Sequence, residues 1–113
     1  MDLVEKISSI LDDAKTEDIS IVDLKNKTSI ADFFIIATCR SSRHADASAV
    51  ELVRQLKNIG IKCPDPSGRP QCDWVIVDAG NIIIHLFKPE IRELYSLEKL
   101  WGMSFDIVND IAT

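Results

Sequence analysis

The feature that most constrains the fold is an unbroken apolar run, Phe33 to Ala37, with polar residues on both sides. The run lacks the alternation of a strand with one wet face, so we expect a central strand that is covered on both faces. Asp32 precedes it, and a Ser/Arg/His group, Ser41 to His44, follows it. Polar groups at the end of a central strand, beside the start of a helix, lie where α/β folds hold their working groups. The sequence therefore predicts an α/β architecture with candidate site residues at the ends of this strand.

Hydrophobic periodicity and turn residues predict the other elements. Ser41 or Ser42 is suited to cap a helix that ends near Gly60. The expected order is a helix over residues 2–15, strands over 19–24 and 33–39, the capped helix running to about residue 58, a short strand over 61–63, a hairpin of strands 74–78 and 82–87, and a helix opened by Pro89. This order predicts a single α/β (α+β) domain, residues 1–102, whose mixed sheet of about five strands carries packed helices. Residues 103–113 are expected to form a C-terminal tail. The connection from strand 33–39 through the capped helix to strand 61–63 has the length of a right-handed crossover.

The charge balance limits the classes of partner. The 113 residues include 13 Lys and Arg and 18 Asp and Glu, a net charge of -5. Phosphate backbones repel such a chain, so a nucleic acid is a poor candidate for a direct partner and a basic protein is a better one.

The three cysteines form neither a disulfide framework nor a zinc motif, and no signal peptide or membrane-spanning run is visible. We expect a cytoplasmic protein that binds no membrane.

Four polar residues are candidates for catalysis: Asp32, His44, Asp78 and His85. A serine or cysteine beside His44 could form a nucleophile–base pair. However, the sequence has no GxSxG elbow, no glycine-rich phosphate loop and no HExxH motif. Structural roles compete: Asp32 could fix the strand entrance, His44 could lie in the first turn of a capped helix, and His85 could face out from a hairpin or pair across it. We expect no catalytic activity, no cofactor and no metal.

Aromatic residues gather in the C-terminal part and offer anchors for a protein partner. Trp74, Phe87, Tyr95 and Trp101 lie there, and glutamates accompany the last two. Aromatic side chains beside charged ones are typical of interaction surfaces. Packing in the core is the competing role, above all for Trp74 and Phe87.

Several motifs, in order, resemble the Iojap-like ribosomal silencing factors. They span most of the chain: Ser29-Ile30-Ala31-Asp32 leading into the apolar strand that ends in Ala37-Thr38, Ser41-Ser42-Arg43-His44, Trp74-Val75-Ile76-Val77-Asp78-Ala79-Gly80, His85-Leu86-Phe87, and Arg92 with Tyr95 and Leu97-Glu98-Lys99-Leu100-Trp101. The chain departs from the family pattern at Cys39, where glycine is usual, and at Ser67, where glutamate is usual.

This resemblance implies a fold related in topology to nucleotidyltransferases, with no known reaction. It implies binding to protein number fourteen of the large ribosomal subunit, which blocks subunit joining and lowers translation when nutrients run short. Family members are often dimers when free. The partner-binding residues we expect are Trp74, Asp78, His85, Tyr95, Leu97, Glu98 and Trp101, whereas the roles of the family-motif positions Asp32, Ser41 and His44 stay open.

Two alternatives to silencing remain. Organellar relatives act in assembly of the large subunit, and the same face could serve that role here. In a nucleotide-handling enzyme, Asp32, Asp78 and His44 would instead hold a metal–triphosphate.

Overall fold

A computed structural model describes residues 2–95 of the chain, with side chains up to Glu93. Its sheet has four strands in the order β1 (Glu17–Asp23), β2 (Phe33–Thr38), β4 (Ile82–Phe87) and β3 (Trp74–Asp78). The central pair β2 and β4 is parallel, and the two outer pairs are antiparallel. The predicted mixed sheet is therefore confirmed, with β2 in a central place.

The short strand expected over residues 61–63 is wrong, and the described sheet has four strands where about five were predicted. Residues 61–66 are irregular, and Pro64 and Pro66 have no N–H to give to a ladder. Ile61 and Cys63 are half-buried against the core, so packing explains their apolar character. The crossover expected from strand 33–39 into strand 61–63 is also wrong, because residues 61–63 form no strand. The chain passes first to β3 at the far edge, and β4 then returns beside β2.

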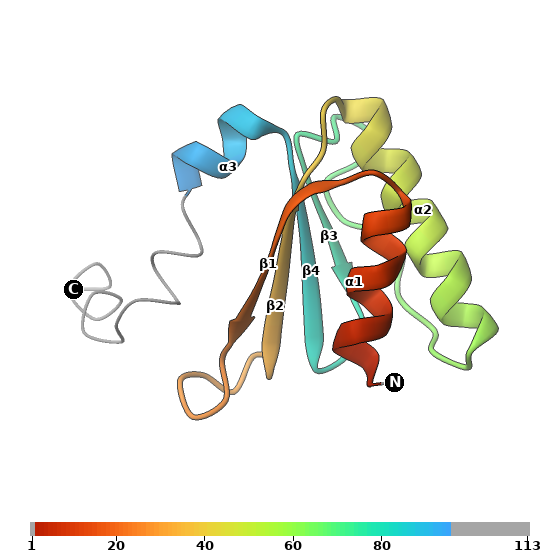
Figure 1. Ribbon diagram of the computed structural model, residues 1–113, viewed down its shortest axis with the longest axis vertical. Helices are drawn as coiled ribbons and strands as arrows, with labels where there is room; N and C mark the ends of the chain where they lie inside the picture. The colour runs from red at the N-terminus through yellow and green to blue at the C-terminus, as the bar shows by residue number, and fades with distance from the viewer. Residues whose placement is uncertain (1, 96–113) are drawn as a thin grey trace.

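Two capped helices cover one face of the sheet (Figure 1). In α1 (Leu3–Asp13), a carboxylate oxygen of Asp2 accepts from the Glu5 N–H at 2.9 Å. In α2 (Ser42–Asn58), the Ser41 hydroxyl accepts from the His44 N–H at 3.1 Å, so a predicted cap is confirmed and Ser41 is the one of the two candidates that forms it. The fully buried side chains between these helices and the sheet include Ile7, Leu11, Ala49, Leu52, Leu56, Ile35, Val75, Val77, Ile84 and Leu86. No helix in residues 2–95 is long and apolar enough to cross a membrane.

The opposite face of the sheet carries a second apolar cluster. Its buried members are Val22, Leu24, Ala31, Phe34, Ile36 and Phe87. Helix α3 (Pro89–Tyr95), which opens at the predicted proline, packs Ile91 against one end of this face (Figure 1).

Cys39 leaves β2 in ordinary backbone conformation, because it is not among the described residues with positive φ. Its N–H donates to the Phe87 carbonyl at 2.7 Å. Its buried thiol has a pKa raised by burial to about 11. Replacing the family's usual glycine therefore leaves the strand exit intact.

Candidate functional site

An aromatic cluster with a histidine at its centre lies on the face opposite α1 and α2. His85 of β4 contacts Phe34 edge-on, with ring centroids 4.5 Å apart, and stacks with Phe87 at 6.0 Å. Trp74 of β3 lies against Phe87 at 4.9 Å. The alternation of the strands produces this cluster, since Val75, between Trp74 and Ile76, points to the helices.

His85 pairs across the hairpin, which was one of its two predicted arrangements. The Trp74 indole Nε1–H donates to His85 Nδ1 at 3.0 Å. An Nδ1 that accepts leaves the proton on Nε2, and Nε2 is buried with no hydrogen-bond partner among the described residues. Burial also lowers the pKa of His85 from 6.5 to about 4. The ring is therefore neutral near pH 7, and it fixes the tryptophan rather than carrying charge.

Trp74 is half-buried, while Phe87 is fully buried. The loop before β3 fixes the position of the tryptophan. Ser67 pairs with Ile76 as an isolated β-bridge, and Gly68 approaches the Trp74 carbonyl so closely that any Cβ there would overlap it. Trp74 is thus an aromatic side chain with a fixed backbone and a fixed ring edge, which is the form that binding anchors take.

Helix α3 is joined to this face by a side-chain hydrogen bond. The Arg92 guanidinium donates from Nη1 to the Thr38 hydroxyl at 2.7 Å, which links α3 to the end of β2. Tyr95 is the last residue of α3. The other predicted contact residues, Leu97, Glu98 and Trp101, lie outside the described part of the chain.

Asp78 is placed apart from the aromatic cluster. It lies four residues beyond Trp74 on β3, roughly 13 Å at strand spacing. Its carboxylate accepts from the Gly80 N–H at 2.8 Å and so closes the hairpin turn. The structure therefore gives Asp78 a local role in the turn.

His44 connects the two helices that cover the sheet. Its Nδ1 accepts from the Arg40 N–H at 3.1 Å, and its Nε2 lies 2.8 Å from the Ala14 carbonyl oxygen at the end of α1. Because Nδ1 accepts, Nε2 carries the proton and donates it. Both ring nitrogens are in use, so His44 has a structural role in the first turn of α2.

The three residues of the metal–triphosphate hypothesis are not brought together. Asp32 precedes β2 and His44 follows it, so a six-residue strand separates them by roughly 20 Å. Within residues 2–95, no group of three His, Cys, Asp or Glu side chains could hold a metal ion.

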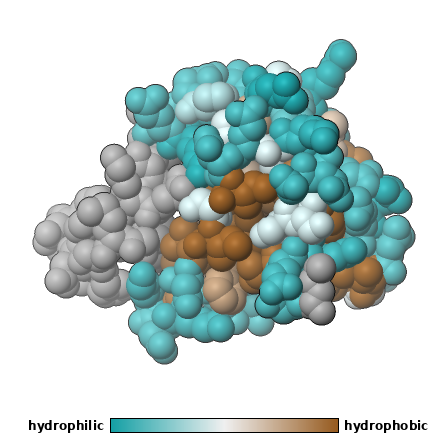
Figure 2. All heavy atoms as spheres, in the orientation of Figure 1, coloured by the Kyte–Doolittle hydropathy of each residue, from teal (hydrophilic) through white to brown (hydrophobic). Residues whose placement is uncertain are grey.

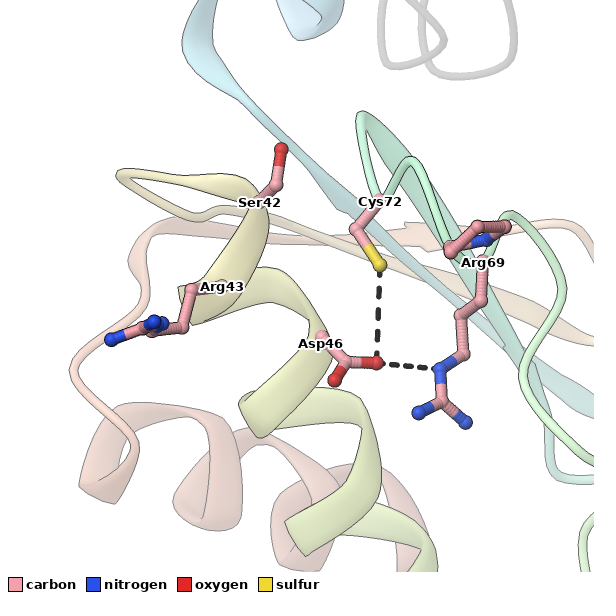
Figure 3. Close-up of a pocket in the computed structure, with 6 residues that line it drawn as sticks. Ser42, Arg43, Asp46, Arg69 and Cys72 are labelled. Atoms are coloured by element: carbon pink, nitrogen blue, oxygen red, sulfur yellow. Dashed lines mark hydrogen bonds and ion pairs between the residues drawn. The ribbon is translucent and has the colours of Figure 1, made fainter.

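A polar pocket beside the start of α2 was not anticipated from the sequence (Figure 3). Asp46 of α2 forms an ion pair with Arg69 at 2.5 Å, and the Cys72 Sγ lies 3.8 Å from the same carboxylate. Burial, followed by the nearby charge of Asp46, raises the pKa of the Cys72 thiol. The carboxylate thus ties the loop before β3 to α2. Asp46 on the helix lies more than twenty positions before Arg69 and Cys72 in the loop, and no sequence pattern connects it with them.

Comparison with known proteins identifies the family. The model of the family described as "Ribosomal silencing factor during starvation" matches residues 1–112. The chain belongs to this family. It is 43% identical over 100 residues to the ribosomal silencing factor of Zymomonas mobilis, covering 88% of this chain and 75% of that one. With the Haemophilus influenzae silencing factor it shares 41% identity over 102 residues, 90% of this chain and 100% of that one.

The chain is also similar to a mitochondrial protein and to two solved bacterial structures. A mouse protein named for mitochondrial assembly of the large ribosomal subunit is 37% identical over 91% of this chain, which spans 47% of that protein. A crystal structure from Chromobacterium violaceum superposes with a TM-score of 0.82 at 33% identity, covering 92% of this chain and 89% of that one. Another, from Bacillus halodurans, gives 0.78 at 32% identity, covering 88% and 92%. The resemblance read from the sequence motifs is confirmed.

Proposed function

We propose that this chain represses translation by binding the large ribosomal subunit, through its protein number fourteen, and blocking its union with the small subunit. The observation that carries the proposal is the family match over residues 1–112. The names of the bacterial relatives describe silencing, a regulatory role rather than a catalytic one. In this account the chain acts in the cytoplasm by occupying a surface, and it needs no cofactor and no chemical step.

The aromatic face of the sheet is the contact surface in this proposal. Trp74 is its central anchor, because the ring is half-buried and His85 holds its N–H. A side chain that is already fixed loses less conformational entropy when it binds. The proposed contact residues also include Tyr95, the last residue of α3, and Leu97, Glu98 and Trp101, which lie outside the described residues. Asp78 would meet a cationic group at the distant end of β3.

Electrostatics favour a basic protein as the partner. The net charge of -5 repels ribosomal RNA and attracts a basic ribosomal protein. In the free state we propose a homodimer. If the dimer hides the aromatic face, it must open before binding, and the apparent affinity falls by the fraction that is open.

Sedimentation with separated subunits tests the proposal. The purified chain should migrate with large subunits in a gradient and reduce the yield of joined particles when small subunits are added. Migration at the top of the gradient with normal joining would contradict it.

The name of the mouse relative favours a second candidate, a factor for large-subunit assembly. Depletion in cells separates the two roles. Loss of a silencing factor should leave large subunits mature and raise the number of joined particles during starvation, whereas loss of an assembly factor should leave immature large subunits in growing cells.

A further inference from the structure

A groove lies between the start of α1 and the sheet, on the opposite side of the sheet from the aromatic face. Its volume is about 630 Å³, within the usual range of ligand pockets. Leu3 and Val4 of α1, with Phe33 and Ile82 of the sheet, supply an apolar lining. These four side chains are at the border of the main core, and the first three are only partly buried.

An exposed isoleucine extends this apolar surface along the sheet edge. Ile21 of β1 pairs in register with Ile35 of β2, whose side chain packs in the core beneath the helices. Opposed residues point to the same face, so Ile21 lies on the groove side, yet 49% of it is exposed. In Figure 2, apolar atoms gather between the positions of α1 and β1 and are bordered by hydrophilic ones. Among the described strands, β1 has a neighbour on one side alone, at the edge of the sheet.

Carboxylates dominate the rim of the groove. Asp2, Glu5 and Asp32 line it, and Lys25 is the single basic residue among the lining side chains. The ammonium of Lys25 lies 4.8 Å from the centre of the Phe33 ring, where it shows that this ring can receive a cation. The groove thus combines an apolar floor with a negative border.

The charge of the rim decides the kind of occupant. In a two-fold symmetric contact a second copy would place the same carboxylates against each other, which is unfavourable. Nucleic acids and anionic membranes carry phosphates, which this border repels. We propose that the groove binds a segment of a different protein, in which a large apolar side chain is flanked by Lys or Arg. The apolar side chain enters beside Phe33, and the cations meet Glu5 and Asp32.

Selection from a random peptide library tests this assignment on the purified full chain. Displayed peptides of about twelve residues are selected on the native chain and counter-selected on the variant that carries Ile21→Lys and Glu5→Lys. Selected peptides should place a large apolar residue between basic ones. They should shift the backbone amide NMR signals of residues 3–5, 21–25 and 33. Ile21→Lys alone and Glu5→Lys alone should each weaken peptide binding by about tenfold.

Val50→Lys is the matched control, because Val50 is 47% exposed, close to the 49% of Ile21, but lies on α2 and not on the strand beside the groove. It should change peptide affinity by less than about twofold. Trp74→Ala should also leave the affinity unchanged, which separates this surface from the proposed ribosome contact. The assignment is overturned if the selected peptides lack basic residues, if the amide shifts map elsewhere, or if Val50→Lys weakens binding as much as Ile21→Lys. It is equally overturned if Ile21→Lys converts a dimer to a monomer in sedimentation equilibrium, since the occupant is then a second copy.

Discussion

The indole of Trp74 donates its Nε1–H to Nδ1 of His85 at 3.0 Å, so a partly buried tryptophan is held by a histidine that is 5% exposed. The arrangement fixes the tautomer of His85 and the edge of the tryptophan together. It also leaves the Nε2–H of the histidine buried without a described partner. The stability of the aromatic face therefore depends on His85 being neutral.

Acidification should destabilise the fold through His85. Burial lowers its pKa from 6.5 to about 4 in the folded chain, so between these values the unfolded chain binds more protons. The contribution is complete above pH 6.5 and is lost as the pH falls toward 4, by up to about 3 kcal/mol in the free energy of unfolding. Urea unfolding across this pH range measures it. The comparison is with His85→Phe, which differs from the native chain only at this residue. Its free energy of unfolding should fall less steeply with acidification, and equal slopes would contradict the assignment.

Substitution of Gly68 should be more damaging than that of another glycine with similar backbone conformation. Gly68 has φ +99° and Gly60 has φ +90°, but a Cβ at Gly68 would overlap the Trp74 carbonyl, whereas nothing lies within 4 Å of one at Gly60. Gly60→Ala should lower the free energy of unfolding by about 1 kcal/mol from backbone strain alone. Gly68→Ala should add the cost of displacing the loop and reach at least about 3 kcal/mol. Chemical denaturation checks both, and equal losses would show that the loop yields freely.

Removing the His44 ring should weaken the connection between α1 and α2 without altering the aromatic face. His44→Ala loses the hydrogen bonds to Ala14 and Arg40, and we expect a loss of about 2 kcal/mol in the free energy of unfolding. Ser41→Ala removes only the helix cap and should lower it by about 1 kcal/mol. If His44 instead took part in ribosome contact, His44→Ala would weaken large-subunit binding in the fully folded fraction, which affinity measurements on that fraction would detect.

Local patterns were enough to predict most of the fold. The central strand, a cap at Ser41 or Ser42, the hairpin and the helix opened by Pro89 each depend on neighbouring residues, and the structure has all four, with Ser41 as the cap. Strand 61–63 failed because a short apolar run looks the same whether it pairs in a sheet or packs beneath a helix. Ile61 and Cys63 pack against the main core without pairing in the sheet.

The arrangement of the site was less accessible to sequence reasoning. Trp74 and His85 could be singled out, but their hydrogen bond depends on the register of β3 against β4. The ion pair of Asp46 with Arg69 depends on the path of an irregular loop. Such contacts join distant residues, and neither periodicity nor spacing encodes them.

The most direct test of the account is the affinity of Trp74 variants for purified large ribosomal subunits. Trp74→Ala should weaken binding by at least about 30-fold, since truncating a central aromatic anchor removes about 2 kcal/mol or more. Trp74→Phe, which keeps much of the ring and loses only the N–H, should lie between this variant and the native chain. Unfolding curves must show that both variants are folded at the assay temperature. Native affinity for folded Trp74→Ala would contradict the claim that this face of the sheet binds the ribosome.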